Sequence, residues 1–375
     1  MKVRINIGDI AKIAGGSGFE PRFQGQAGLP IPFIKVSDFQ LSSDGWLSTA
    51  ANTVNEETLK IIGAKKFPKG TIIFPKVGGA LLTNKRARLG CAAAIDNNIM
   101  GLIPHEGYAD YLYYFLLYFD MGLIANTQAL PSVNAGNVAK IELPALEGYD
   151  RESILSALKK RLALAEKAKS ATMRQCVEIR ELENQIIFNS LRSKSKSSIR
   201  IGDALTEIFT GIGSDWAKYP VLGATRKGLA PAREQPGKTP QRYKPAFPGT
   251  VFYNPMRIMI GSVAFVDDDD TPGITSPDYV VLRGKPGVTD SRWFYHWLRS
   301  PLGEQCISSL ARGAVRERML FNRLAEGEIE LPDFPSQERA SKALAAIKPM
   351  RTALEKQKKE LELMPKKLLA QVFES

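Results

Sequence analysis

Ile141-Glu142-Leu143-Pro144 returns in this chain as Ile329-Glu330-Leu331-Pro332, and each copy stands just before a long charged stretch with helical periodicity. Ile7-Gly8-Asp9 returns as Ile201-Gly202-Asp203, each time at the start of a β-rich globular stretch. Repeats of this kind decide the architecture, because each copy is expected to fold into the same kind of unit.

A third pair of motifs supports the duplication. Gly70-Thr71 and Gly249-Thr250 each open an apolar run, one in each half of the chain. The three pairs keep their order although the separation between copies differs, so the copies differ by insertions. The sequence therefore predicts a globular unit and a helix followed by a second globular unit and a second helix. Two similar heads held by two helices are suited to reading two places on one elongated partner.

The composition is that of a folded protein, with 375 residues, 44% hydrophobic residues and a net charge of +12. This length allows two to three domains with a core in each. We find no run of about 18 apolar residues and no secretory signal. The three cysteines, Cys91, Cys176 and Cys306, are scattered and odd in number. They indicate a reducing, cytoplasmic location rather than a disulfide framework.

The excess of basic residues lies mostly in the two helical stretches, and the globular heads are nearly neutral. A basic balance favours a polyanionic partner such as a nucleic acid. Helices rich in Lys and Glu are also common as plain solvated faces. The charge alone therefore leaves both interpretations open.

Two long helices are predicted. From Asp150 to Leu191 the chain has no Gly or Pro, and its apolar residues recur mostly at steps of three and four, which predicts one amphipathic helix of roughly 60 Å. Residues 336–373 show the same periodicity, but we expect a kink or break at Pro349 and at Pro365. The two helices should bury their apolar faces against each other as an antiparallel coiled coil, with the heads related by an approximate two-fold axis.

The predicted fold class is α+β, with two similar globular domains of mixed or antiparallel β structure and short helices. The predicted boundaries are residues 1–148 and 197–334 for the two domains, 149–196 for the central helix and 335–375 for the C-terminal helix. The remaining expected elements are strands at Ile31–Val36, Thr71–Phe74, Thr250–Tyr253, Met259–Val266 and Tyr279–Leu282, helices at Asp110–Phe119 and Ser291–Leu298, and a polar linker at Ser193–Ser198.

The sequence lacks a recognisable catalytic motif. No phosphate-binding loop of the form G-x-x-x-x-G-K-[ST] occurs. Asn254-Pro255-Met256-Arg257 has only the first half of the motif of amino-methyltransferases, and Pro277-Asp278 lacks the second element of a nuclease motif. A turn is the favoured interpretation at both places.

A metal site is also not predicted. The chain has only two histidines, His105 and His296, so a site built on His is improbable. Asp267–Asp270 is a run of four acids that could hold a cation, but it lacks the regular ligand spacing and the Gly of a calcium-binding loop. We favour an exposed turn between strands.

The order of the motifs resembles a known family. The motifs of the second half are Thr275–Arg283, Trp293–Pro301, Gly313–Arg318, Ile329–Pro332 and Gln337–Arg339, and those of the first half are Gly8–Gly16, Ile34–Phe39 and Leu143-Pro144, with Leu363–Phe373 closing the chain. This succession, which covers essentially the whole chain, is similar to the specificity subunit of type I restriction–modification systems.

The resemblance implies a DNA-binding protein that is not itself an enzyme. Each globular domain would be a target-recognition domain for one half of a bipartite site in double-stranded DNA. The helices would be spacers and would dock two modification (methyltransferase) subunits, with restriction (motor nuclease) subunits joining later. S-adenosylmethionine, ATP and Mg²⁺ would belong to those partner subunits, and this chain would hold no cofactor and no metal.

Candidate DNA contacts follow from the chemistry of DNA, because phosphates attract cations and base edges need side chains that reach them. The predicted DNA-binding residues are Lys76, Lys85, Arg86, Arg88, Gln128, Asn134, Arg226, Lys227, Arg242, Tyr243, Lys244, Arg312, Arg316 and Arg318, with Arg233 and Lys238 in the same loop as Arg226. Each cation could instead be a solubilising charge or an intramolecular ion-pair partner, and Asn134 could simply cap a turn.

Two other classes of function stay open at this point. A divergent DNA methyltransferase or nuclease acting alone would bind S-adenosylmethionine or a divalent metal. A structural coiled-coil protein would bind only proteins, and salt-sensitive retention on heparin would argue against it.

Overall fold

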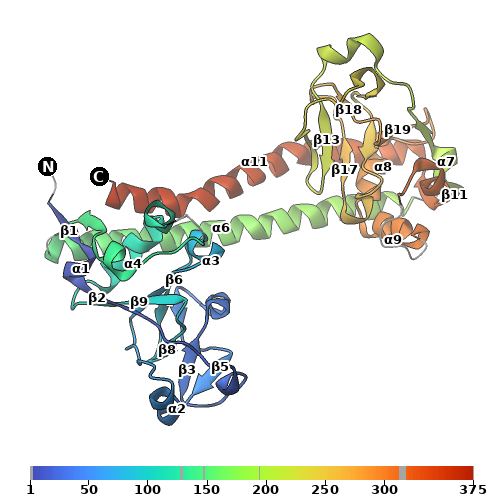
Figure 1. The fold of residues 1–375 in the computed structure, drawn as a ribbon. Helices are drawn as coiled ribbons and strands as arrows, with labels where there is room; N and C mark the ends of the chain where they lie inside the picture. The colour runs from blue at the N-terminus through green and yellow to red at the C-terminus, as the bar shows by residue number, and fades with distance from the viewer. Residues whose placement is uncertain (1–2, 127–129, 147, 194, 312–317, 375) are drawn as a thin grey trace. The chain divides into compact units, whose positions relative to one another are not determined.

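The structure is a computed structural model that describes residues 3–126, 130–146, 148–193, 195–311 and 318–374. The chain forms two compact units, Met1–Ser170 with Lys359–Ser375, and Ala171–Lys358 (Figure 1). Each unit contains one β-rich domain and part of each of two long helices. None of the helices in these described ranges is long and apolar enough to cross a membrane.

The β domain of the first unit has a five-stranded sheet beside a three-stranded sheet. The larger sheet has the strand order β2 (Ala11–Gly15), β9 (Ile99–Pro104), β6 (Ile72–Pro75), β7 (Ala87–Leu89) and β4 (Trp46–Leu47). The smaller sheet has the order β5 (Asn52–Val54), β3 (Ile31–Ile34) and β8 (Ala94–Ile95), with β3 and β8 parallel.

The β domain of the second unit repeats this plan. Its main sheet has the strand order β12 (Leu205–Glu207), β19 (Val280–Gly284), β16 (Val251–Tyr253) and β17 (Val263–Phe265). The order and the antiparallel pairing match β2, β9, β6 and β7 of the first unit. Its smaller strands are β13 (Leu222–Thr225) paired with β14 (Gly228–Pro231), and β15 (Lys244–Ala246) paired with β18 (Gly273–Thr275). The predicted duplication is thus present in the strand order.

Both main sheets are buried on their two faces. Ile72 and Phe74 of β6 belong to one buried cluster, and Ile73, which points to the opposite face, belongs to another. In the second unit Val251 and Tyr253 of β16 lie in one cluster and Phe252 in the other. The cluster on one face of each sheet includes residues of the long helices, so each β domain is held on the helices by its sheet.

The Gly-Thr pairs form the same turn in both copies. Gly70 and Gly249 have φ angles of 88° and 84°, a left-handed conformation that glycine adopts without strain. Thr71 Oγ1 donates to the carbonyl of Pro68 at 2.7 Å, and Thr250 Oγ1 donates to that of Phe247 at 2.6 Å. The turn therefore delivers the chain into β6 and β16 in the same way.

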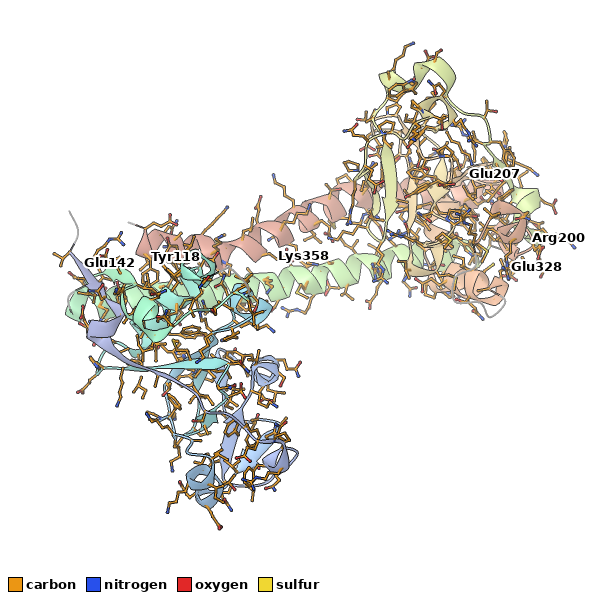
Figure 2. All side chains as sticks on the ribbon, in the orientation of Figure 1. Tyr118, Glu142, Arg200, Glu207, Glu328 and Lys358 are labelled. Atoms are coloured by element: carbon orange, nitrogen blue, oxygen red, sulfur yellow. The ribbon has the colours of Figure 1, made fainter. Side chains whose placement is uncertain are left out.

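The Ile-Glu-Leu-Pro copies each form the last strand of a β domain. These strands are β10 (Glu142–Pro144), which pairs with β1 (Arg4–Asn6), and β20 (Glu328–Pro332), which pairs with β11 (Lys196–Arg200). Figure 2 labels Arg200 and Glu328, which are partners in the second pair. The register differs by two residues between the copies, since Ile5 faces Leu143 whereas Ile199 faces Ile329. A shift of two keeps every side chain on its original face.

The Ile-Gly-Asp copies form the short helices α1 (Ile7–Ile10) and α7 (Ile201–Ala204). A Cβ atom on Gly8 would lie 3.2 Å from the Cβ of Ala139, and one on Gly202 would lie 2.9 Å from the Cβ of Ala325. A side chain would therefore meet a neighbouring turn of the chain at both positions, and the space is tighter at Gly202 than at Gly8. Other short helices of the described residues are α2 (Glu56–Ile61), α3 (Gly79–Leu82), α5 (Ala135–Ala139), α9 (Pro301–Leu310) and α10 (Phe321–Leu324).

The long helices are α6 (Gly148–Ser190) and α11 (Phe334–Phe373). In the first unit Leu155 near the start of α6 shares a buried cluster with Leu368 near the end of α11. In the second unit Ile187 near the end of α6 shares one with Leu344 near the start of α11. The helices thus pack antiparallel within each unit, and the predicted packing of the two is confirmed. The two-fold relation of the heads stays a prediction.

A short helix of each β domain joins these clusters. They are α4 (Ala109–Tyr118) in the first unit and α8 (Ser291–Leu298) in the second. Tyr111 of α4 is fully buried and donates its hydroxyl to the carbonyl of Pro144 at 2.5 Å. Trp293 of α8 is also fully buried and donates Nε1–H to Ser190 Oγ at 2.8 Å. The helices predicted at Asp110–Phe119 and Ser291–Leu298 are therefore confirmed.

Of the kink or break predicted at each proline, the break is wrong, because α11 continues through both Pro349 and Pro365. The kink stays a prediction. Pro349 is exposed, so water can solvate the carbonyl that its missing N–H leaves unpaired. Ion pairs also hold this turn, since the neighbouring Lys348 contacts Asp270 and Arg351 contacts Glu183, each at 2.9 Å.

Two other predicted elements need correction. Met259–Val266 is only partly a strand, because η6 (Ile258–Ile260) is a 3-10 turn that ends at Gly261 with a φ of 80°, and β17 starts later. Ser193–Ser198 is only partly a linker, because β11 already begins at Lys196 and pairs with β20. Tertiary pairing overrides the polar composition there.

Candidate nucleic-acid interface

In the first unit, the candidate cations Lys76 and Lys85 lie on the connection between β6 and β7, residues 76–86. The segment that leads to Asn134 contacts this connection. Gly78 N–H donates to the carbonyl of Pro131 at 2.7 Å, and Val133 N–H donates to that of Lys76 at 3.0 Å. The segment that leads to Asn134 therefore runs beside Lys76. Lys85 is exposed and Lys76 is half-buried, and neither forms an ion pair within the described ranges.

The second unit has the equivalent arrangement at the connection between β16 and β17, residues 254–262. Met319 N–H donates to the carbonyl of Pro255 at 3.1 Å, as Val133 does to Lys76. Arg318, which is exposed, therefore lies next to the start of this connection.

Arg226 reaches the same connection from the turn between β13 and β14. Its Nε–H donates to the carbonyl of Ile260 at 2.9 Å. Arg299, at the end of α8, donates to the carbonyls of Arg226 and Gly261 at 2.5 and 3.3 Å. Arg226 and Arg318, which belong to different clusters in the sequence, thus lie at the two ends of one connection.

Arg86 and Arg88 are internal residues and not surface cations. Arg86 is 6% exposed, and its guanidinium donates to Asn84 Oδ1 at 3.0 Å. Burial lowers the pKa of Arg86 to about 10, against the opposing effect of Asp120. Arg88 is 9% exposed, pairs with Asp110 at 2.7 Å and lies against the rings of Trp46 and Tyr113. Both geometries favour the intramolecular role that the sequence left open.

Two further candidates also have partners inside the protein. Lys227 pairs with Glu355 of α11 at 2.8 Å. Lys244 is largely buried and donates to the carbonyl of Tyr279 at 2.7 Å, near Glu207, which Figure 2 labels. Burial lowers the pKa of Lys244 and raises that of Glu207, and each charge partly offsets the other's shift.

Within the described residues, no hydrogen bond or ion pair joins the side chains of Arg233, Lys238 and Arg242 to the β16–β17 connection. Arg242 ends the 3-10 turn η5 (Pro240–Arg242), which packs on η4 (Gly213–Lys218). Tyr243 accepts from Gly237 N–H through its hydroxyl at 3.0 Å. Arg233, Lys238 and Arg242 are exposed. The structure therefore divides the predicted loop cluster in two.

Asn134 caps a helix in the structure. Its side-chain oxygen accepts from Asn137 N–H at 2.8 Å at the start of α5, so this oxygen is already engaged. Gln128, Arg312 and Arg316 lie outside the described residues. Their assignment to DNA binding stays a prediction.

The two sequences considered as enzyme motifs are turns. The Asn254 side chain accepts from Met256 N–H at 2.9 Å, and Asn254 O accepts from Arg257 N–H, also at 2.9 Å. Asp278 lies in the turn that enters β19. His296 is half-buried. Desolvation of its imidazole, followed by the charges of nearby arginines, lowers the pKa of His296 to about 3. In the described ranges no group of His, Cys, Asp or Glu is arranged to hold a metal ion.

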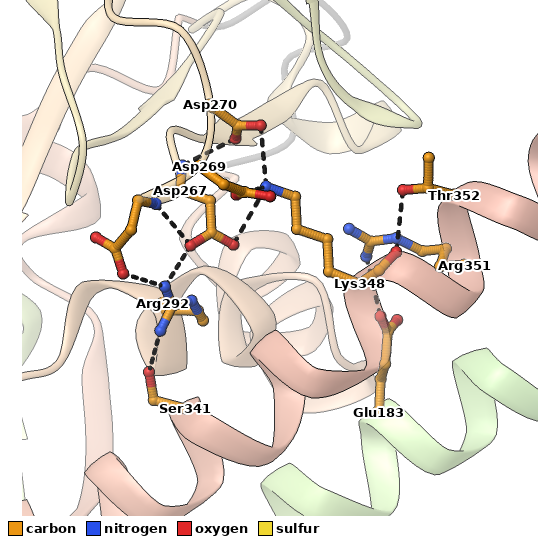
Figure 3. A network of polar contacts seen from close by, with 10 residues as sticks. Glu183, Asp267, Asp269, Asp270, Arg292, Ser341, Lys348, Arg351 and Thr352 are labelled. Carbon is orange, nitrogen blue, oxygen red and sulfur yellow. Dashed lines mark hydrogen bonds and ion pairs between the residues drawn. The ribbon is translucent and has the colours of Figure 1, made fainter.

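The acid run Asp267–Asp270 is an acidic turn between β17 and β18, as predicted, but it is not simply exposed. Asp267 is 8% exposed and pairs with Arg292 of α8, which also contacts Asp268 (Figure 3). Lys348 of α11 contacts Asp267, Asp269 and Asp270. Two cations thus pair with the four acids, and these ion pairs tie the β domain to α11.

Sequence reasoning did not single out a group of exposed aliphatic residues on the β16–β17 connection. Met256, Met259 and Ile260 are 49%, 50% and 51% exposed. The signal in the sequence is a run of apolar residues around Arg257 that contains no acidic residue.

Comparison with known proteins agrees with this architecture. No protein-family model matches the chain. It is similar to the type I restriction enzyme MjaIX specificity subunit of Methanocaldococcus jannaschii, with 26% identity over 163 residues. This alignment covers 40% of the chain and 36% of the relative, so the chain spans about a third of the length of the curated relative that it matches.

Two solved structures are similar over nearly the whole chain. The S subunit of a type I restriction–modification system from M. genitalium matches with a TM-score of 0.53 and 12% identity, covering 100% of this chain and 96% of that one. A chain from a structural study of assembly and conformational transition of the type I R-M system matches with a TM-score of 0.60 and 14% identity, covering 99% and 97%.

This chain has the fold of type I specificity subunits. The identities are too low to carry more than the fold. In this specificity-subunit fold, the duplicated β domain and the two long helices account for the repeated motifs.

Proposed function

We propose that this chain is the specificity subunit of a type I restriction–modification complex. It binds double-stranded DNA at a bipartite site, with one β domain for each half-site, and performs no catalysis itself. The observation that supports this most directly is the duplicated β domain, with the same strand order, turn and closing strand in both copies. Two copies of one reading module fit a target with two separate half-sites.

The partners follow from the same proposal. Two modification subunits dock on α6 and α11, and restriction subunits complete the complex. S-adenosylmethionine, ATP and Mg²⁺ are cofactors of those subunits. The long helices offer exposed apolar side chains for such docking, since Met173, Val177 and Phe188 of α6 are about half exposed.

Cations at the connections of both β domains support DNA as the ligand. Lys85 in the first unit and Arg226, Arg257 and Arg318 in the second are exposed. Such residues supply the phosphate contacts that fix a protein on the duplex. The alternative of a methyltransferase or nuclease acting alone gains no support, because its two sequence motifs are turns.

The proposal is tested by selection from a random duplex library. The chain, purified with the methyltransferase subunits of its host, is incubated with the library in the presence of S-adenosylmethionine, and bound DNA is sequenced. We expect enrichment of one asymmetric motif with two defined parts and a fixed gap. Equal recovery of all sequences by an intact complex would contradict the proposal.

A further inference from the structure

We propose that the β16–β17 connection (residues 254–262) and its counterpart, the β6–β7 connection (residues 76–86), are the surfaces that contact base pairs. Exposed aliphatic side chains lie against the bases, and the cations beside them contact the phosphates. This inference rests on the proposed DNA-binding function and specifies which part of each β domain reads the DNA.

Several apolar side chains of the β16–β17 connection are exposed together at one place. Met256, Met259 and Ile260 are each about half exposed although they lie within five residues of one another. Single exposed apolar residues need no explanation, but a group of them indicates a contact surface. Apolar side chains in the grooves contact thymine methyl groups or wedge between base steps.

The charged residues of both connections are all basic. Residues 254–262 and residues 76–86 contain no Asp or Glu. Arg257 is exposed and enters no ion pair in the described part of the chain, and Arg226 and Arg318 lie at the two ends of its connection. The apolar group of residues 254–262, with the three cations Arg226, Arg257 and Arg318 beside it, is complementary to a polyanion, which favours DNA over a protein partner.

The two connections are equivalent parts of the duplicated β domain. The β6–β7 connection occupies the same place in the strand order as the β16–β17 connection. Val133 N–H donates to the carbonyl of Lys76 in the first unit, and Met319 N–H donates to that of Pro255 in the second. It presents Leu82, which is 48% exposed, close to the exposed Lys85. The scaffold is thus shared while the exposed side chains differ between the copies. Two different half-sites read at the same place on two equivalent domains require this combination.

Side-chain hydrogen bonds hold both connections in place. The β16–β17 connection is fixed by the side chain of Asn254, by Arg226 and by Arg299, all through hydrogen bonds to its backbone. The β6–β7 connection is fixed by Asn84, which bonds Arg86, Asp120 and the N–H of Met121. A reading surface must be held in place by its surroundings to discriminate between base pairs.

The test compares Met259→Ser and Leu82→Ser with a matched control, Leu41→Ser. Leu41 is of the same type as Leu82 and is 47% exposed, but it ends the 3-10 turn η2 (Val36–Leu41) and belongs to neither connection and to neither long helix. Each variant is purified with the methyltransferase subunits and selected against the random duplex library. Recovery of the subunits and binding to a fixed non-specific duplex over a salt series are measured in parallel.

We expect Met259→Ser to relax the preference in one half of the motif and Leu82→Ser in the other half. The loss should be at least about fourfold at the affected position, the value of one buried methylene-sized contact. Non-specific binding, its salt dependence and subunit recovery should stay at wild-type values. Leu41→Ser should select the wild-type motif. Arg257→Gln should weaken binding to all sequences and lower the salt slope by about one unit.

Three results would overturn the inference. If the wild type selects a bipartite motif and both Met259→Ser and Leu82→Ser keep it unchanged, the connections do not read bases, although the proposed function stands. If either variant loses the methyltransferase subunits, its connection is a protein-docking face. If the wild type selects no motif, the proposed function fails and this inference fails with it.

Discussion

The ammonium group of Lys348 lies 2.9 Å from a carboxylate oxygen of Asp270, and this ion pair joins α11 to the acidic turn of the second β domain (Figure 3). Lys348 also contacts Asp269, and Asp267 lies between Lys348 and Arg292. The acidic turn is therefore a structural link between a β domain and a helix. Because Lys348 precedes Pro349, the link holds α11 at the point where its own hydrogen bonding is weakest.

Lys348→Met should destabilise the second unit by about 1–3 kcal/mol. The substitution keeps the aliphatic stem but leaves three carboxylates without their shared cation, and removing one partner of a largely buried pair is costly. The midpoint of urea unfolding measures the effect. Lys356→Met, at an exposed position of the same helix, is the control and should lie within about 0.5 kcal/mol of the wild type. Equal midpoints for both variants would show that the link contributes nothing.

The stability of this link should fall in acid. Burial by itself would raise the pKa of Asp267, but hydrogen bonds from Arg292 and from Asp268 N–H bring it below the usual value. A carboxylate with a lowered pKa contributes stability above its unfolded pKa of about 3.9 and loses it as pH falls through the folded value. Asp267→Asn should therefore be less stable than the wild type near pH 6, and the gap should close toward pH 2. Melting temperatures measured across this range decide the point, and a gap that persists unchanged would contradict it.

Gly202→Ala should destabilise the protein by about 1–3 kcal/mol, because the new Cβ would lie 2.9 Å from the Cβ of Ala325. Gly8→Ala should cost less, since its nearest contact is 3.2 Å from Ala139. Gly18→Ala meets nothing within 4 Å and is the control. Thermal unfolding of the three variants should give this order, and a neutral Gly202→Ala would refute the packing argument for the repeated Ile-Gly-Asp motif.

Lys85 and Arg86 are adjacent cations with different expected roles. Lys85→Gln should lower the salt slope of DNA binding by about one unit without changing stability, because Lys85 is exposed. Arg86→Gln should instead lower the stability by about 1–3 kcal/mol, because it breaks a buried hydrogen bond to Asn84. Titrations at several salt concentrations, with unfolding curves on the same preparations, separate the two. An unchanged slope for Lys85→Gln would remove it from the DNA contacts.

Much of the fold could be predicted because it depends on local signals. The repeated motifs predicted the duplication. The absence of Gly and Pro from Asp150 to Leu191, together with the spacing of apolar residues at steps of three and four, predicted the first long helix, and its apolar face predicted the packing against the second. The continuity of α11 through Pro349 could not be predicted, because ion pairs with residues far away in the sequence compensate for the proline. The strand at Lys196–Arg200 was missed because its stability comes from pairing with β20 and not from its own polar residues.

The candidate site was less predictable than the fold. Arg88 is indistinguishable from a surface cation in the sequence, and only the folded chain places it between Trp46 and Tyr113. Arg226 and Arg318 are far apart in the chain and come to one connection through hydrogen bonds to backbone carbonyls and the strand order. The exposure of Met259 was hidden because Met-rich apolar runs are usually core.

The most direct test of the central claim is single-molecule sequencing of DNA methylation in the host, with and without this gene. We predict that deletion of the gene abolishes methylation at one asymmetric motif with two parts and a fixed gap, and that restoring the gene restores this methylation. An unchanged methylation pattern, in a host whose methyltransferase subunits are shown to be present and active with this chain, would contradict the claim that it reads a bipartite DNA site.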